Sequence, residues 1–96
     1  MKVEFSPRAI TDLTDIGDYI ARDNPANADN FVNVLLDYCL EIKLAPEGYT
    51  ARPELGENIR SLPFKAYMIF YTSSETHIRI ERILHGSRDY LSGEYL

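Results

Sequence analysis

The stretch KAYMIFYTS, residues 65–73, is the clearest guide to the architecture of this chain. Its apolar side chains fall on both faces of an extended segment: Tyr67, Ile69 and Tyr71 on one, Met68 and Phe70 on the other. Alternation with a period of two indicates a β-strand, and a strand that is apolar on both faces is typical of the middle of a sheet. The sequence therefore predicts a sheet with this segment at its centre.

A second strand is predicted in HIRIERILH, residues 77–85, which follows the short polar turn SSET and forms an antiparallel hairpin with the first. Ile78 and Ile80 point to one face. Arg82 has the same parity as these isoleucines, although the two residues after it are both apolar. A β-bulge near Arg82, or a part of this face that opens to water, would account for the change of phase. A shorter strand, NIRSLP at residues 58–63, precedes the central one.

Two amphipathic helices are predicted before these strands. Ser6 followed by Pro7 is a typical helix start, and the first helix should run from Pro7 to Arg22. Its apolar stripe consists of Ile10, Leu13, Ile16 or Gly17, and Ile20. Asn24 before Pro25 separates it from a second helix, predicted over residues 26–44. The short connection makes the two helices an antiparallel hairpin.

The order of elements completes the expected fold. An alternating strand, KVEFS at residues 2–6, precedes the helices, so the order is β–α–α–β–β–β. The second helix has apolar residues at helical spacing: Phe31, Val34 or Leu35, Tyr38, Ile42 and Ala45. Each helix has to bury its apolar stripe, and one face of a small antiparallel sheet is the surface available. We therefore expect an α+β fold in a single domain spanning residues 1–96.

The composition restricts the classes of function. The chain has 96 residues, a formal net charge of −5 and one cysteine, Cys39, so no internal disulfide can form and no metal site is expected. Residues 1–46 carry eight acidic and four basic side chains, including a row of Asp12, Asp15 and Asp18 that we expect to be solvated. This balance disfavours direct binding to nucleic acid. Without a membrane span or a signal peptide, and with no cofactor motif, a cytoplasmic protein is expected.

No phosphate-binding glycine loop, HExxH motif or GxSxG motif occurs in the sequence. The remaining candidates for chemistry are charged side chains in the second half: Arg60, Arg79, Arg82, His85, Arg88 and Asp89. A metal-free ribonuclease would need such groups as general base, as general acid and as cations that hold the phosphate. The alternative is that they form local ion pairs and that His85 closes the last strand.

Three segments resemble the ParE toxins of the RelE/ParE toxin–antitoxin superfamily: FSPRAITDLTDIGDYIARDNP at residues 5–25, ARPELGENIRSLPFKAYMIFY at 51–71 and IRIERILHGSRDY at 78–90. The resemblance implies a helical hairpin packed on a small antiparallel sheet. It also implies one of two activities. RelE-like members cut mRNA on the ribosome, whereas ParE-like members are not nucleases and poison DNA gyrase. Both kinds are held inactive by an antitoxin that is encoded beside them.

The resemblance also bears on the choice between these activities. In the cleaving branch the central strand carries an arginine after its first tyrosine, against the scissile phosphate, and this chain has Met68 there. The preceding loop carries Glu47, Glu54 and Glu57 against Arg52 alone. We therefore expect a gyrase inhibitor that is not an enzyme. A RelE-like ribosome-dependent mRNA endonuclease and an inert module that only folds with its partner are the alternatives.

Two sets of residues are expected to contact proteins if the chain is ParE-like. The residues expected to contact the target, DNA gyrase, are Arg60, Arg82, His85 and Arg88. A ParD-like antitoxin is expected to insert an amphipathic segment into an open groove between the helical hairpin and the sheet edge. Its contacts are expected at Leu13, Ile20, Phe31 and Leu35.

Overall fold

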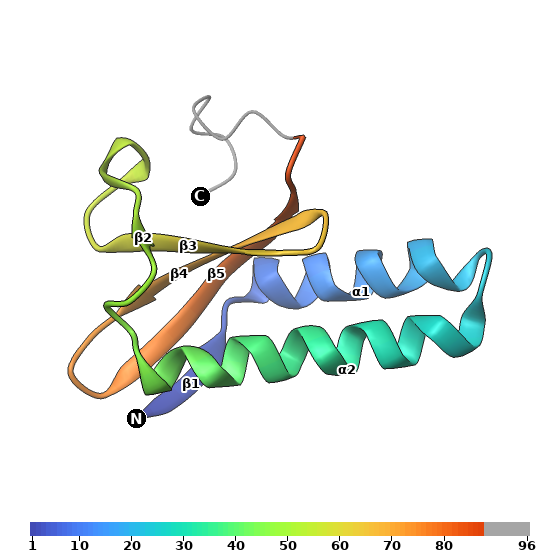
Figure 1. Cartoon of the computed structure of the whole chain (residues 1–96), viewed down its shortest axis with the longest axis horizontal. Coiled ribbons are helices and arrows are strands. Elements are labelled where there is room, and N and C mark those ends of the chain that lie inside the picture. Colours follow the sequence, from blue (N-terminus) through green and yellow to red (C-terminus); the bar gives the residue numbers. More distant parts are fainter. Residues whose placement is uncertain (88–96) are drawn as a thin grey trace.

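The computed structural model describes residues 1–87, and Arg88, one of the residues expected to contact the target, lies outside them. Two helices lie against one face of a five-stranded sheet, and the hairpin they form extends beyond the sheet (Figure 1). The first helix, α1, spans Pro7–Ala21, and the second, α2, spans Pro25–Glu41. The expected two-layer α+β fold is thus confirmed. In the described part of the chain, no helix has both the length and the apolar character needed to cross a membrane.

The strand β4, Tyr67–Ser73, lies in the middle of the sheet, as its sequence predicts. The strand order is β1-β5-β4-β3-β2, with β5 at His77–His85 and β3 at Ile59–Phe64. The edge strands are β1, Lys2–Phe5, and β2, Thr50–Ala51, which lies in a segment predicted as a loop. Because β1 runs parallel to β5, the sheet is mixed and not wholly antiparallel. The long connection through the helical hairpin and three strands permits this parallel pairing.

Both helices begin where the sequence predicts. The side chains of Ser6 and Asn24 each accept a hydrogen bond from the backbone N–H three residues further on, at 3.0 and 3.1 Å. A proline follows each of these caps, at a position where no backbone donor is needed. The helix α1 ends at Ala21, one residue earlier than predicted, and α2 is followed by a separate 3₁₀ turn over Ile42–Leu44.

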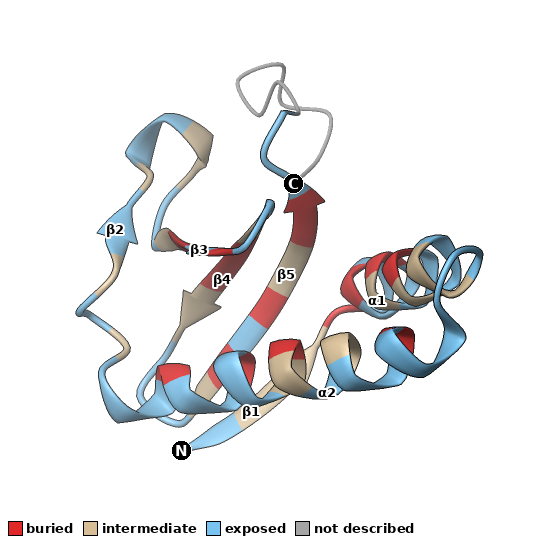
Figure 2. Ribbon diagram, turned by 45° about the vertical axis from the view of Figure 1, so that its right-hand side comes forward, coloured by how far each residue is buried: buried red, intermediate tan, exposed pale blue. Residues whose placement is uncertain are grey.

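The hydrophobic core lies between the helices and the sheet (Figure 2). Its buried members are Ala9, Ile16, Leu35, Cys39, Ile42, Leu62, Phe64, Ile69, Tyr71, Ile78, Ile80 and Ile83. On α1 the buried stripe passes through Ala9, while Ile10 is 54% exposed, so the predicted stripe is wrong at Ile10. Alanine has no side chain beyond Cβ, so it lets the first turn of α1 approach the sheet where isoleucine would not fit.

The change of phase in β5 is a β-bulge, which confirms one of the two explanations expected from the sequence. The pairing of β4 with β5 shifts between Phe70 and Tyr71, and Glu81 is the extra residue in β5. Because of this extra residue, Ile80 and Ile83 both reach the core although they are three positions apart.

Beyond the end of β1, this edge of β5 has no neighbouring strand, and side chains at the start of α1 bond to its backbone instead. The Ser6 hydroxyl donates a hydrogen bond to the carbonyl of Glu81 at 2.7 Å. The carboxylate of Asp12 accepts one from the backbone N–H of Ile83 at 3.0 Å. Backbone groups that β1 would otherwise pair are therefore satisfied by the start of α1.

Asp12 also holds the side chain of Arg82. The guanidinium Nε and Nη2 atoms donate to the two carboxylate oxygens at 2.8 and 2.9 Å. The two side chains are 10% and 12% exposed, so this is a largely buried, bidentate ion pair. The expectation of a solvated acidic row is therefore wrong for Asp12, whereas Asp15 and Asp18 are exposed. Asp12 differs from them because it faces the uncovered edge of β5.

Replacing Asp12 with alanine should lower the free energy of unfolding by about 3–5 kcal/mol, because it leaves a buried guanidinium and a buried N–H without their acceptor. Urea denaturation followed by circular dichroism measures this change. Asp15→Ala removes an exposed carboxylate from the same helix and should change the free energy of unfolding by less than about 0.5 kcal/mol. Equal losses in the two variants would contradict the structural role of Asp12.

Cys39 should be unreactive while the protein is folded. Its side chain is fully buried, and burial raises the pKa of the thiol from 9.0 to about 12. A thiol reagent at neutral pH should therefore label the folded protein far more slowly than the protein in concentrated guanidinium chloride. The same shift predicts that stability falls as the pH rises above about 9, where the unfolded chain releases the proton first. Fast labelling without denaturant would contradict the packing of α2.

Candidate functional site

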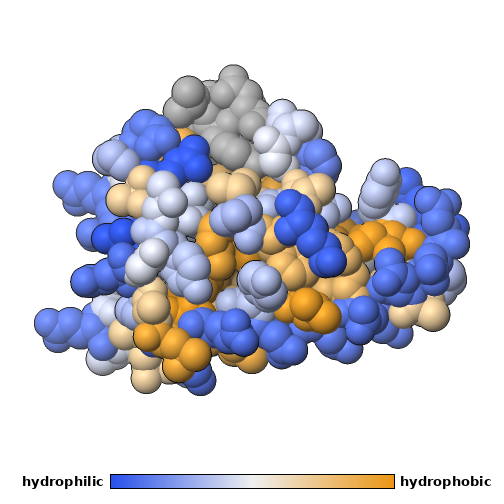
Figure 3. Space-filling view, in the orientation of Figure 1, coloured by the Kyte–Doolittle hydropathy of each residue, from blue (hydrophilic) through white to orange (hydrophobic). Residues whose placement is uncertain are grey.

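The residues expected to contact an antitoxin lie in two environments. Leu13, Ile20 and Phe31 are half-buried and pack against the margin of the core. Leu35 is fully buried and presents no surface to a partner. Figure 3 shows hydrophobic side chains exposed over the helices and near their junction with the sheet, bordered by hydrophilic ones. The helical hairpin thus has a partly covered apolar surface, and antitoxin binding there stays a prediction.

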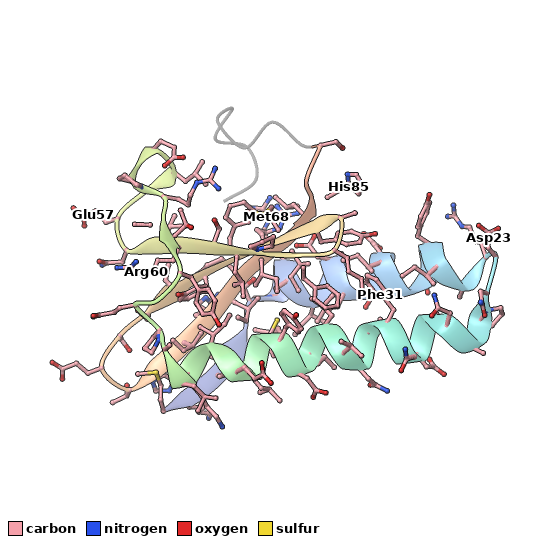
Figure 4. All side chains as sticks on the ribbon, in the orientation of Figure 1. Asp23, Phe31, Glu57, Arg60, Met68 and His85 are labelled. Atoms are coloured by element: carbon pink, nitrogen blue, oxygen red, sulfur yellow. The ribbon has the colours of Figure 1, made fainter. Side chains whose placement is uncertain are left out.

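Five rings form a continuous line, the aromatic row, from α2 past the β3–β4 turn to the end of β5. Its members, in order, are Tyr38, Phe64, Phe31, Tyr67 and His85. Successive ring centroids lie 4.7, 5.3, 5.9 and 5.5 Å apart, and each pair meets edge to face. Phe64 is buried, whereas Tyr38 is 43% exposed and His85 is exposed at the far end. In Figure 4, Phe31 lies between the two layers and His85 at the end of β5.

Tyr67 in the aromatic row interacts electrostatically with a tyrosine of α1. Burial raises the pKa of Tyr67, and the phenol of Tyr19 raises it further. Tyr19 itself is 65% exposed. The sequence analysis missed Tyr19, Tyr38 and Tyr67 as surface residues. Their hydroxyl groups were the available signal, because a tyrosine commonly keeps one end in water.

The opposite face of the sheet carries the residues that alternate with the core: Ser61, Met68, Phe70 and Leu84. Arg52, just after β2, lies over it with its guanidinium carbon 5.8 Å from the centroid of Phe70. The same guanidinium donates to the Ser61 hydroxyl at 3.2 Å and to the Glu54 carboxylate at 2.9 Å. The hydrogen bond from Arg52 is the main cause of a lowered pKa at Glu54. Arg52 is thus held by a ring, a hydroxyl and a carboxylate.

Three of the four residues expected to contact the target lie in the described part of the chain, and these three are not gathered in one cluster. Arg60, near the start of β3, donates a hydrogen bond to the carbonyl of Tyr49 at 2.8 Å. His85 lies at the other end of the sheet, with its Nδ1 2.8 Å from the Ser87 hydroxyl (Figure 4). Arg82 is bound to Asp12 between them. These residues occupy three separate environments, and their contact with a target stays a prediction.

A hollow of about 740 Å³ lies beside Arg60, between the β2–β3 loop and the β4–β5 turn. Its lining includes three carboxylates, Glu47, Glu57 and Glu75. Arg60 is engaged with the backbone of Tyr49, so the charged groups that line the hollow are mostly acidic. An anionic ligand such as a nucleic-acid phosphate would meet repulsion here.

Comparison with known proteins agrees with the fold described above. A family model described as the ParE toxin of the type II toxin–antitoxin system parDE matches residues 3–90. Among solved structures, a chain from the chromosomal ParDE TA system of P. aeruginosa is similar in fold, with a TM-score of 0.77 and 19% sequence identity. The similarity covers 88% of this chain and 95% of that one. No curated protein gives a significant match. Since the family model spans nearly the whole sequence, the chain belongs to the ParE toxin family of type II toxin–antitoxin systems.

Proposed function

We propose that this ParE toxin acts by binding DNA gyrase and that a ParD-type antitoxin neutralises it by covering the helical hairpin. Membership of the ParE family supports a paired antitoxin, and the name parDE points to one of the ParD type. The choice of a binding mechanism over RNA cleavage rests chiefly on one residue, Met68, the second residue of the central strand β4.

A ribonuclease that uses no metal has to stabilise the charge that develops on the scissile phosphate. Met68 lies on the sheet face away from the helices and brings no charge to it. Among the described residues, Arg52 and Arg82 bring guanidinium groups to this face. That of Arg52 is occupied by Glu54, Ser61 and the ring of Phe70, and that of Arg82 by Asp12. Drawing either group toward a phosphate would break these contacts, which favours a protein that does not cleave RNA.

The distribution of the other candidate groups supports the same conclusion. A general base, a general acid and a cation must all lie within hydrogen-bond reach of one substrate, about 3 Å from the atoms they act on. Arg60 and His85 lie at opposite ends of the sheet, and Arg82 is committed to the buried Asp12. A RelE-like mRNA endonuclease remains the alternative function, and cellular assays separate the two.

The proposed antitoxin site is the aromatic row together with Leu13 and Ile20. Amphipathic segments commonly bind by placing apolar anchors on such a surface. Half-buried aromatic rings that are rigid and already packed supply much of the energy in protein interfaces. Phe31 is the central candidate, since its ring touches those of Phe64 and Tyr67.

Production of the toxin without its antitoxin should stop growth and induce the SOS response while transcripts stay intact. An SOS reporter and sequencing of RNA 5′ ends measure the two effects in the same culture. Co-production of the antitoxin from the adjacent reading frame should restore growth. Site-specific cuts in translated mRNA would support the RelE-like alternative, and unimpeded growth with folded toxin present would support an inert module.

The variants Phe31→Ala and Leu13→Ala should each weaken antitoxin binding by about tenfold or more, since each removes a partly exposed apolar anchor. Isothermal titration calorimetry with the antitoxin gives the dissociation constants. Glu75→Ala, in the β4–β5 turn, is the control and should bind as the unmodified chain does. Unchanged affinity in Leu13→Ala, Ile20→Ala and Phe31→Ala alike would exclude this surface.

A further inference from the structure

We infer that the antitoxin segment covering the aromatic row is positively charged: an amphipathic helix that places lysines or arginines against the end of the row at Tyr38. This inference rests on the proposed antitoxin partnership and adds the chemical character of the partner. The inference is based on the charge pattern of the helical hairpin.

The hairpin has an uncompensated acidic surface. Six of its carboxylates are exposed: Asp15, Asp18, Asp23, Asp29, Asp37 and Glu41. The exposed basic side chains of the same segment, residues 7–41, are Arg8 and Arg22. In the described part of the chain, none of the six carboxylates belongs to an ion pair. The free toxin therefore exposes net negative charge on its helical hairpin.

These carboxylates are poorly placed for the stability of the free helices. A helix favours acidic residues in its first turn and basic residues in its last. Neither helix has an acidic residue in its first turn, while Asp18 lies in the last turn of α1 and Glu41 is the last residue of α2. Asp37 and Glu41 are like charges four residues apart, which repel each other. A partner with the opposite charge would relieve both effects.

Carboxylates flank the end of the aromatic row at Tyr38. Glu41 follows Tyr38 by three residues and so lies on the same side of α2, and Asp37 is the residue next to Tyr38 in the sequence. An aromatic ring beside a carboxylate suits a guanidinium or an ammonium group, which can meet the ring face and the oxygens together.

The middle of the row has a different character. The ammonium group of Lys65, in the β3–β4 turn, lies 5.9 Å from the centroid of the Phe64 ring. A partner's basic side chain would be repelled there, so its apolar anchors belong at this point, over Phe31. The arrangement fits a helix with apolar residues over Phe31 and basic residues at the end that lies against Tyr38.

Reversing two charges beside Tyr38 tests the inference. The double variant Asp37→Lys/Glu41→Lys should weaken binding of the antitoxin from the adjacent reading frame by about tenfold or more at low salt. The double variant Glu47→Lys/Glu75→Lys makes the same change of charge around the hollow near Arg60 and should weaken it by less than about threefold. Calorimetry of the full-length proteins gives both values. For the unmodified pair, added sodium chloride should raise the dissociation constant, because exposed ion pairs are screened.

A second readout separates lost charge complementarity from lost folding. Lysines in the last turn of α2 suit the helix dipole, so Asp37→Lys/Glu41→Lys should melt at the same temperature as the unmodified toxin or higher. A stable variant that binds weakly supports the inference. Unchanged or tighter binding by this variant would overturn it and leave the partnership intact. Absence of binding by the unmodified toxin at every salt concentration would overturn the proposed partnership itself.

Discussion

The buried ion pair between Asp12 and Arg82 joins the two layers of the molecule at the point where β1 ends. The carboxylate binds the side chain of one residue and the backbone N–H of the next, Ile83, so it fixes α1 on the edge of β5 in both position and register. The rest of the hairpin follows from this anchor. Val32 of α2 packs beside Gly17 of α1, and α2 carries Phe31 to the β3–β4 turn. Without the anchor, the aromatic row would lose the alignment of its helical and sheet halves.

The central strand β4 presents side chains to both faces of the sheet. Tyr67 points to the helices and joins the aromatic row, while the next residue, Met68, points to the other face. Since successive side chains of a strand alternate, one segment contributes Tyr67 to the proposed antitoxin surface and Met68 and Phe70 to the opposite face. On that second face, Arg52 covers Phe70 and donates to the Ser61 hydroxyl, so these contacts hold its guanidinium against the sheet.

Local sequence signals were sufficient to predict the helices and strands. They failed where contacts with residues distant in the sequence determine the structure. The caps at Ser6 and Asn24, the central position of β4 and the bulge in β5 follow from neighbouring residues. From the sequence, Asp12 could not be distinguished from the exposed Asp15 and Asp18, because its partner, Arg82, is 70 residues away. The parallel pairing of β1 and the two-residue β2 are likewise set by tertiary contacts. The aromatic row joins four elements, so no periodicity within one segment could reveal it.

A toxin that binds gyrase and a toxin that cleaves mRNA should give different results in assays with purified components. The toxin should be incubated with DNA gyrase and plasmid in one reaction and with translating ribosomes in another, at matched concentrations. We expect loss of supercoiling activity in the first reaction and full-length transcripts in the second. Transcript fragments with defined 5′ ends, together with unaffected gyrase, would contradict the proposal that this protein, with a methionine near the start of β4, has no ribonuclease activity.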